Sequence, residues 1–253
     1  MSPVPTTTTV AVDLDGAVAT LTLNRPERMN AFDPTMVAEF ADIWAWVRTD
    51  PRVRVVVLRA AGDRAFCTGM DVRAQWSWPD DVWSHEDPGR TLSPKWGQRV
   101  WKPLICAVRG MAAGGAFYWL NEADLVLAAP EATFFDPHVT YGMTAAPGPI
   151  GLSRRIGVGA VLELTLLGND RRLDAQRAYQ LGLVNEVVDG GRLDARAAEL
   201  ARVLAERDPT AVQGAVRAVW ESLDLPRTVA LERSLSYSQI STAARRPAAE
   251  GAS

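Results

Sequence analysis

The sequence predicts an α/β protein in which a body of repeated strand–strand–helix units precedes a helical C-terminal region. Two β-rich segments, residues 10–13 and 18–23, flank Asp15-Gly16, a dipeptide typical of hairpin turns. Strand and helix patterns then alternate as far as residue 190, and beyond Asp189-Gly190-Gly191 only helical spacing of apolar residues occurs. We therefore predict a body over residues 1–190 and a helical region over residues 191–253.

The first long helix is predicted from its start signal and its apolar face. Asp33 suits the N-cap and Pro34 the first helical position. Apolar residues follow at helical spacing to about Arg48, namely Met36, Phe40, Ile43, Trp44 and Val47. The run Val55-Val56-Val57-Leu58, within residues 53–59, next predicts a strand that is buried on both faces.

Residues 73–99 interrupt this pattern, because they form a long aperiodic segment containing Trp76, Trp78, Trp83 and Trp96. A loop of this length is usually functional or mobile. Beyond it we predict strands at 104–108, 124–128 and 184–188, and helices at 114–120, 158–167 and 175–181. Asp174 and Gly182 suit the two caps of the last of these helices. Two more helices are predicted, over residues 193–204 and from Pro209 onward.

Composition excludes several classes of function. The 253 residues carry 27 Lys+Arg against 30 Asp+Glu, which argues against binding to nucleic acid or to an anionic membrane surface. Cys67 and Cys106 are too far apart for a ligand-spaced metal pair and lie in apolar surroundings, so we expect buried thiols in a reducing compartment. Residues 1–9 lack the pattern of a signal peptide. The sequence predicts a cytoplasmic protein without a metal site, a membrane span or a nucleic-acid partner.

Three segments carry a chemical signal. Residues 64–72 follow the buried strand, and residues 132–142 run from a strand into a Gly/Pro-rich connection. Between them, residues 108–117 end a strand and open a helix at Gly114-Gly115. The unpaired N–H groups of such a helix start favour a developing negative charge. No phosphate-binding loop, nucleophile elbow or HExxH motif occurs.

At these segments the sequence resembles the enoyl-CoA hydratase/isomerase (crotonase) superfamily. Residues 24–31 are similar to the family's NRPxxxNA motif, residues 65–71 to AFxAGxD, residues 109–116 to NGxxxGGG, and residues 182–188 to GLVxxVV. The four motifs occur in the family's order, and the resemblance covers about residues 10–225.

The resemblance implies a spiral of ββα units, with a helical C-terminal part that builds homotrimers, often paired into hexamers. It implies acyl-CoA thioester substrates, so that coenzyme A is part of the substrate and no separate cofactor is expected. The family's oxyanion hole, which consists of two backbone N–H groups, falls on Met70 and Gly115. The alternative that Gly114-Gly115 only allows a helix to pack closely against a strand stays open.

The sequence departs from the family at the two glutamates used by hydratases, because those positions hold Tyr118 and His138. Tyrosine is a poor base at pH 7 but can donate a hydrogen bond, whereas histidine can act as acid or base. We therefore expect His138 to transfer protons and Tyr118 to support it, against the alternative of a structural histidine. Asp136, two residues away, either orients the imidazole or caps a turn.

The resemblance also implies substrate contacts. Arg28 and Arg73 match positions near the CoA adenine and phosphates, against the alternative of surface arginines. Further candidates for substrate or CoA contacts are Ala65, Thr68, Asp71, His85 and Tyr141; of these, Asp71 has the alternative role of fixing its own loop. The four tryptophans indicate a bulky or aromatic acyl group, or else trimer packing. Residues 246–251 resemble the family's RPxxEG, and the sequence ends at Ser253, which leaves open whether the CoA adenine site is reduced.

We therefore expect an enzyme that stabilises an enolate of an acyl-CoA thioester, of the lyase or isomerase type rather than a standard crotonyl-CoA hydratase. Three alternatives remain open at this stage. One is a non-catalytic acyl-CoA-binding homologue, the second is a C–C bond hydrolase or decarboxylase that uses His138, and the third is a hydrolase of a cyclic diketone without CoA.

Overall fold

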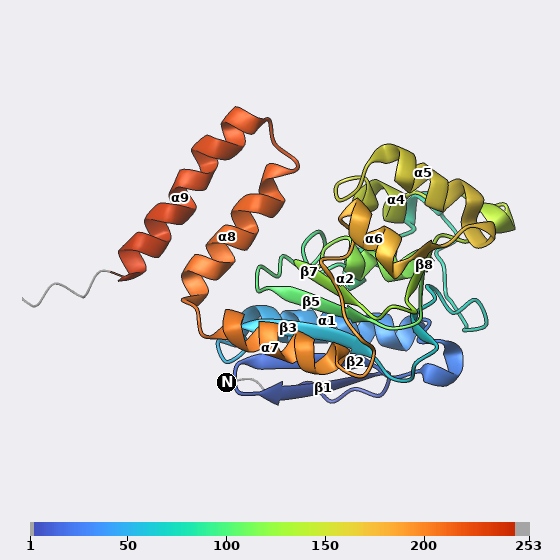
Figure 1. The fold of residues 1–253 in the computed structure, drawn as a ribbon, viewed down its shortest axis with the longest axis horizontal. Helices are drawn as coiled ribbons and strands as arrows, with labels where there is room; N and C mark the ends of the chain where they lie inside the picture. Colours follow the sequence, from blue (N-terminus) through green and yellow to red (C-terminus); the bar gives the residue numbers. More distant parts are fainter. Residues whose placement is uncertain (1–2, 246–253) are drawn as a thin grey trace, which may run out of the picture.

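Two β-sheets lie at the centre of the computed structural model, which describes residues 3–245 (Figure 1). The larger has the strand order β1-β2-β3-β5-β7-β10; it is antiparallel at the β1–β2 hairpin and parallel elsewhere. Its strands are β1 (Val10–Asp15), β2 (Val18–Leu23), β3 (Val55–Ala60), β5 (Leu104–Val108), β7 (Leu125–Ala128) and β10 (Glu186–Val187). The predicted α/β class is confirmed.

The smaller sheet receives a short strand after each of three strands of the larger sheet. Its order is β4 (Ala65–Cys67), β6 (Met111–Ala113), β8 (Thr133–Phe135) and β9 (Leu173–Asp174), and the first three are parallel. The sequence analysis placed no strand at β4, β6 or β9. These elements are two or three residues long, too short for an alternating apolar pattern to mark them.

The predicted helix signals agree with the structure. α1 spans Pro34–Thr49, and the Asp33 carboxylate accepts a hydrogen bond from the Met36 N–H at 2.9 Å. α5 spans Val158–Leu167, and α6 spans Ala175–Leu181 with the Asp174 cap at its start and left-handed Gly182 at its end. The remaining helical elements are η1 (Pro26–Arg28), η2 (Val82–Ser84), α2 (Gly89–Leu92), η3 (Gly114–Ala116), α3 (Phe117–Leu120), η4 (Val139–Tyr141), α4 (Pro147–Leu152), η5 (Gly168–Asp170), α7 (Leu193–Ala205), α8 (Pro209–Ser222) and α9 (Arg227–Arg245).

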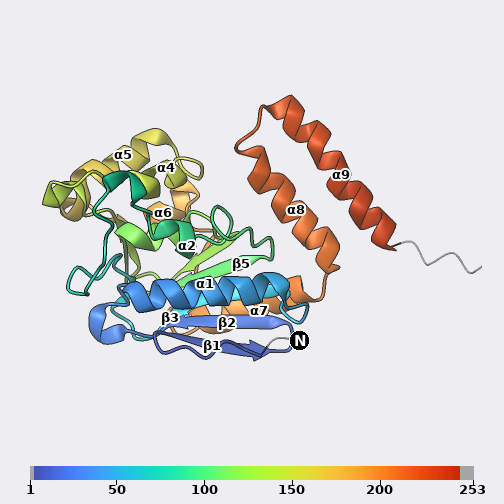
Figure 2. The ribbon, with the colours of Figure 1, turned by 180° about the vertical axis from the view of Figure 1, so that it is seen from behind.

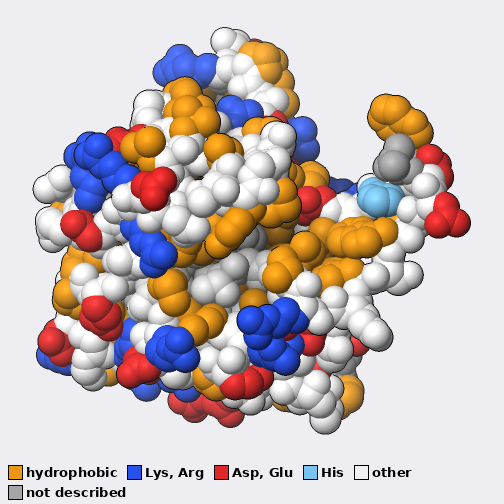
Figure 3. Space-filling view, turned by 90° about the vertical axis from the view of Figure 1, so that its right-hand side faces the viewer, with side chains coloured by type: hydrophobic (Ala, Val, Ile, Leu, Met, Phe, Trp, Pro, Cys, Tyr) orange, Lys and Arg blue, Asp and Glu red, His pale blue; other side chains and the backbone are white. Residues whose placement is uncertain are grey.

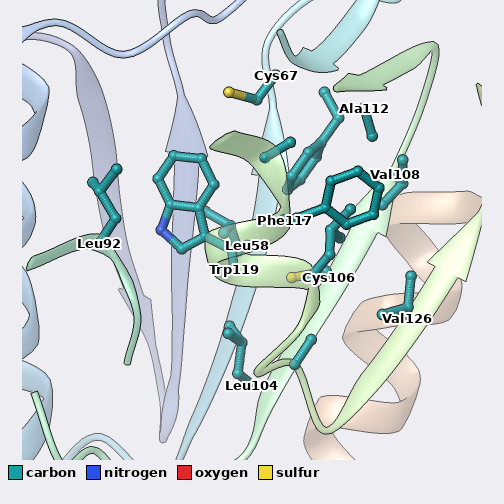
Figure 4. Packing of buried hydrophobic residues seen from close by; sticks show 14 of the residues in the cluster. Leu58, Cys67, Leu92, Leu104, Cys106, Val108, Ala112, Phe117, Trp119 and Val126 are labelled. Atoms are coloured by element: carbon teal, nitrogen blue, oxygen red, sulfur yellow. The ribbon is translucent and has the colours of Figure 1, made fainter. Parts of the chain in front are cut away.

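The main hydrophobic core lies between the larger sheet, α1 and α3. Figure 4 shows Phe117 and Trp119 of α3 among side chains of β3, β5 and β7. Cys67 and Cys106 are fully buried free thiols, as predicted, and burial raises the pKa of both, that of Cys67 to about 12. Both thiols therefore stay protonated at neutral pH and act as small apolar groups.

A second core covers the other face of the larger sheet. Leu193, Ala197 and Ala201 of α7 are buried against residues of β3, β5 and β7. α7 therefore forms a layer on the sheet, although it lies beyond residue 190, where the sequence predicts the helical region to begin.

α8 and α9 form a helical hairpin that extends from the body (Figures 1 and 2). α9 lies in the region that the sequence predicts to be helical, although no separate helix is predicted at its residues. The hairpin leaves large apolar side chains exposed, among them Val219, Leu231, Leu235 and Ile240. No helix within residues 3–245 is long and apolar enough to cross a membrane. The RPxxEG-like segment, residues 246–251, lies outside the described residues.

Candidate functional site

The turn after β4 directs the backbone of Met70 away from the sheet. Gly69 takes a left-handed conformation (φ 88°), and its carbonyl accepts a hydrogen bond from the Phe32 N–H at 2.9 Å. The Asp71 N–H donates to the Phe32 carbonyl at 2.8 Å. Because this parallel bridge uses the neighbours of Met70, the N–H of Met70 itself points to the other side of the turn.

Gly115 lies directly beside this turn, at the start of η3. A Cβ atom on Gly69 would lie 2.9 Å from the Gly115 nitrogen, so the two backbone segments approach as closely as only glycine permits. A Cβ on Gly115 would lie 2.4 Å from the Phe32 ring. The structure therefore brings the two candidate backbone donors, Met70 and Gly115, to one place. The close packing of these two segments requires glycine at positions 69 and 115.

His138 lies against this place from a third segment, at the end of the smaller sheet. A Cβ on Gly114 would lie 3.4 Å from His138 Cε1. His138 Nδ1 is 2.5 Å from the Asp136 Oδ1 atom, which also accepts the His138 backbone N–H at 3.0 Å. Asp136 is almost fully buried, whereas the His138 side chain is 37% exposed. Asp136 therefore orients the imidazole and also caps the turn, and Nε2 is the ring nitrogen left for a further partner.

The charge of Asp136 sets the protonation of His138. The hydrogen bond that the His138 imidazole donates to Asp136 raises the pKa of His138; burial opposes this, and the charges of Asp136 and Asp87 add to it. The protonated imidazole is therefore favoured to a higher pH than in a free histidine.

Tyr118 is held between two glycines of the site. Its ring would overlap a Cβ on Gly89 (2.2 Å) and approach one on Gly115 (3.2 Å). Burial raises its pKa, and the negative charges of Asp87 and Asp136 add to this effect. The phenol therefore stays neutral and acts as a hydrogen-bond donor rather than a base. Asp87 is not among the residues that the sequence marks, because a single acidic residue in an aperiodic loop carries no pattern.

Aromatic side chains continue from the site into the loop between β4 and α2. Phe32 meets Trp76 edge to face at 6.2 Å, Trp76 stacks on Trp78 at 5.6 Å, and Trp78 stacks on His85 at 5.5 Å. The Trp76 indole N–H donates to the Asp71 carbonyl at 2.9 Å, which ties the stack to the residue after Met70. His85 is therefore the last ring of a continuous aromatic wall formed by Phe32, Trp76, Trp78 and His85.

Trp83 and Trp96 do not belong to this stack. Trp83 is 92% exposed. Trp96 lines a cavity of about 660 Å³ that lies between the body and the end of α8, where Trp101 and Trp220 are also found. Tyr118 lines this cavity as well, so the cavity adjoins the candidate site.

One face of the molecule is hollowed where these segments meet. η1 and the loop before α2 lie on the right in Figure 1, and Figure 3 views the molecule from that side. Hydrophobic side chains border the hollow, and Lys and Arg side chains lie around it (Figure 3). Asp and Glu side chains also lie on this face, so the hollow has apolar walls and a charged rim (Figure 3).

The segment 24–31 fixes the turn that carries Met70. Asn30 is buried, and its amide donates to the carbonyls of Ala61 and Ala65, at 2.9 and 2.8 Å. The Arg25 guanidinium pairs with Asp33 and Asp71, at 3.1 and 3.0 Å. Two residues of the NRPxxxNA-like motif, Arg25 and Asn30, therefore hold the loop in place.

Asp71 has the alternative role considered from the sequence, which is to fix its own loop. Its Oδ1 atom accepts the Arg73 N–H at 3.0 Å. Burial acts to raise its pKa, but the Arg73 N–H, the Arg25 guanidinium and the charge of Arg28 outweigh burial and lower it. Asp71 is thus an ionised anchor of this loop.

The other residues predicted to contact the substrate or CoA differ in their exposure to solvent. Arg28 and Arg73 are exposed, and Thr68 is half-buried between β4 and Met70. Ala65 is buried, and its carbonyl already accepts from Asn30. Tyr141 is 68% exposed and ends η4, one turn beyond His138.

Comparison with known proteins identifies relatives over nearly the whole chain. A family model described as enoyl-CoA hydratase/isomerase matches residues 13–252. The chain is 34% identical to (E)-benzylidenesuccinyl-CoA hydratase of Thauera aromatica, over 91% of this chain and 88% of that protein. It is 35% identical to 1,2-epoxyphenylacetyl-CoA isomerase of Escherichia coli, over 81% and 78%. A crystal structure of an enoyl-CoA hydratase/isomerase from Mycobacterium paratuberculosis superposes with a TM-score of 0.83 at 34% identity, over 92% and 88% of the two chains.

Proposed function

Because the chain belongs to the enoyl-CoA hydratase/isomerase family, we propose that it is an enzyme acting on the CoA thioester of an aromatic acyl group through a thioester enolate. The observation that carries this proposal is the convergence of Met70, Gly115 and His138 on one place. Two backbone donors and one proton-transfer group are the parts that enolate chemistry needs.

The proposed mechanism follows from the roles of these groups. Removal of a proton from the carbon next to the thioester places negative charge on the thioester oxygen, and return of a proton to that carbon discharges it. The N–H groups of Met70 and Gly115 stabilise that charge, with about 3–4 kcal/mol for each donor in a water-poor site. His138 moves the proton through Nε2, while Asp136 fixes the ring and stabilises the imidazolium.

The proposed reaction is of the isomerase or lyase type. Tyr118 and His138 stand, by resemblance, where hydratases have two glutamates. Tyr118 is held neutral, so it is proposed as a hydrogen-bond donor that positions the substrate rather than as a base for water. His138 is then the proposed proton-transfer group, and a standard hydratase mechanism with two carboxylates is not proposed.

The aromatic stack supports an aromatic acyl group. Phe32, Trp76, Trp78 and His85 form a continuous wall that starts beside Gly115. Offset and edge-to-face contacts with such a wall favour a flat ring over an alkyl chain. The two relatives reported above have phenyl-containing acyl groups in their names. Arg28 and Arg73, exposed beside Asp71, are proposed to contact the phosphates of CoA.

A panel of aromatic and aliphatic CoA esters tests the proposal. Binding is measured by calorimetry, and each mixture is then analysed by mass spectrometry. We expect product from at least one aromatic ester and none from that ester with His138→Ala. Tight binding without product from any ester would favour the non-catalytic homologue, and absence of binding to every CoA ester would favour a CoA-independent hydrolase.

A further inference from the structure

The turn that carries Met70 is held by one side chain on each of its flanks. Before Met70, the Gly69 N–H donates a hydrogen bond to the Cys67 Sγ atom at 3.3 Å. After Met70, the Asp71 carbonyl accepts a hydrogen bond from the Trp76 indole N–H at 2.9 Å. Cys67 is fully buried, whereas Trp76 is half-buried in the loop between β4 and α2. The second hydrogen bond therefore joins the turn to the loop that carries the aromatic wall.

Trp76 contacts the aromatic wall and the backbone of this turn with different parts of its side chain. Its ring stacks on Trp78, with centroids 5.6 Å apart and an angle of 12° between the planes, and it meets Phe32 edge to face at 6.2 Å. The indole N–H is directed to the Asp71 carbonyl at the same time. Because the ring and its N–H have separate partners, each contact can be changed without the other.

Phe32 connects Trp76 to the second candidate donor. The backbone N–H and carbonyl of Phe32 bond to the residues before and after Met70, at 2.9 and 2.8 Å. The Phe32 ring lies so close to Gly115 that a Cβ there would be 2.4 Å away. In a close-packed interior such contacts leave little room for independent movement. A displaced indole would therefore shift Asp71 and Phe32, which hold the segments of both donors.

The position of these donors matters for the proposed chemistry. A backbone N–H stabilises an oxyanion when it lies about 2.7–3.1 Å from the place that the oxygen will occupy, and a misplacement of about 1 Å can cost about 100-fold in rate. The negative charge on the thioester oxygen develops only as the enolate forms. A hydrogen bond that fixes the carbonyl next to Met70 should therefore affect the maximal rate more than the affinity for the ester.

We propose that Trp76 is a positioning residue for the Met70 backbone donor, and that its indole N–H holds the Asp71 carbonyl in place while its ring completes the acyl-binding wall. One side chain then serves both recognition of the acyl group and stabilisation of the enolate. Its part in turnover rests on the proposed function. Its hydrogen bond to the turn does not, and is measurable without a substrate.

The first experiment measures this hydrogen bond in the free protein. 3-Benzothienylalanine, introduced at position 76 by codon suppression, keeps the size of the indole and lacks its N–H. Trp83→Phe removes an exposed indole from the same loop and is the control. We expect the Asp71 amide, followed by hydrogen exchange with NMR, to exchange about 5–10-fold faster in the position-76 variant and less than about 2-fold faster in the control. Equal exchange in the position-76 variant and the wild type would overturn the proposal.

The second experiment separates the indole N–H from the ring. Its probe is exchange of the α-protons of 3-phenylpropanoyl-CoA in D₂O, measured over a range of ester concentrations. The 3-benzothienylalanine variant should lower the maximal rate by about 5–10-fold and keep the half-saturating concentration within about 2-fold. Trp76→Ala, which removes the ring as well, should also raise the half-saturating concentration by at least about 5-fold. An unchanged maximal rate in the 3-benzothienylalanine variant would overturn the role of the N–H.

The two experiments distinguish a failure of this inference from a failure of the proposed function. If the wild type binds the ester without exchanging its α-protons, while the Asp71 amide exchanges faster in the position-76 variant, the proposed function is contradicted and the hydrogen bond of Trp76 stands. If the wild type exchanges the α-protons and the 3-benzothienylalanine variant does so at the same rate, the inference alone is contradicted.

Discussion

Gly115 combines a structural and a chemical requirement in one residue. A methyl group there would lie 2.4 and 2.7 Å from two Phe32 ring atoms and 3.2 Å from Tyr118. Both rings belong to the core and the aromatic wall, so neither moves without displacing its neighbours. The residue that donates the proposed oxyanion hydrogen bond is therefore also the one that tolerates no side chain.

We expect Gly115→Ala to lower the stability by about 1–3 kcal/mol and turnover by at least about 100-fold. Urea unfolding and steady-state kinetics measure the two effects. Gly159→Ala is the matched control, because a Cβ there meets nothing within 4 Å; it should retain both stability and activity. Alanine keeps the backbone N–H, so wild-type turnover in Gly115→Ala would contradict the expectation that the clash with the two rings displaces this donor.

The candidate residues differ in how far the sequence reveals them. Met70, Gly115, Tyr118 and His138 were identified because they stand at motif positions. Asp87 has no motif, and its placement depends on how a long aperiodic loop folds back onto α3. Such a contact is a property of the tertiary fold rather than of local pattern.

At the scale of elements, the loop between β4 and α2 carries the proposed acyl specificity. Its tryptophans stack in sequence order on Phe32, and one of them is tied to the Asp71 carbonyl. The sequence marked this loop as unusual but did not separate Trp76 and Trp78, which join the site, from Trp83 and Trp96, which do not.

We expect Trp78→Ala to raise KM for an aromatic CoA ester by about 5–10-fold, since one stacking face is lost. KM for a short aliphatic ester should be nearly unchanged. Trp83→Ala removes an exposed ring outside the stack and serves as control. An equal loss for aromatic and aliphatic esters in Trp78→Ala would contradict an aromatic acyl pocket.

Long elements were predictable and short or unusual ones were not. α1 and α6 have cap residues that mark their ends, and α5 is marked by its apolar residues. β4, β6 and β9 exist because they pair with other short strands, which local sequence does not show. α9 packs on α8 but leaves apolar residues such as Leu231 and Leu235 exposed, so its apolar residues do not mark a single buried face.

At the scale of the whole molecule, half-buried Glu122 couples folding to pH. Its oxygens accept the N–H groups of Lys95 and Trp96, at 2.6 and 3.0 Å. Burial raises its pKa from the ordinary value of 4.5 to about 7. The folded protein therefore binds more protons than the unfolded chain between these values, so this contribution is fully present below pH 4.5 and is lost as pH rises through 7.

In the wild type, the contribution of Glu122 to the unfolding free energy falls by about 3 kcal/mol between pH 4.5 and 7. Glu122→Gln removes this contribution, so the unfolding free energy should depend less on pH over the same range. Chemical denaturation across this range measures the slope. Glu232→Gln, an exposed position on α9, should leave the wild-type slope intact. Identical slopes for wild type and Glu122→Gln would refute the role of Glu122.

We propose that the exposed apolar side chains of α8 and α9 are covered in the homotrimer or hexamer that the family resemblance implies. Val219, Leu231, Leu235 and Ile240 lie on a hairpin that extends from the body, where a second copy can cover them (Figure 2). Light scattering should give three or six times the chain mass of 27.5 kDa. A monomer at all concentrations would contradict this assembly.

The central claim is that Met70, Gly115 and His138 together stabilise and protonate a thioester enolate. Exchange of the α-protons of 3-phenylpropanoyl-CoA in D₂O, followed by proton NMR, tests it without knowledge of the natural reaction. Binding of the ester is first established by calorimetry. The account predicts exchange with the wild type and a rate at least about 100-fold lower with His138→Ala. An ester that binds but does not exchange, or equal exchange in the two proteins, would contradict it.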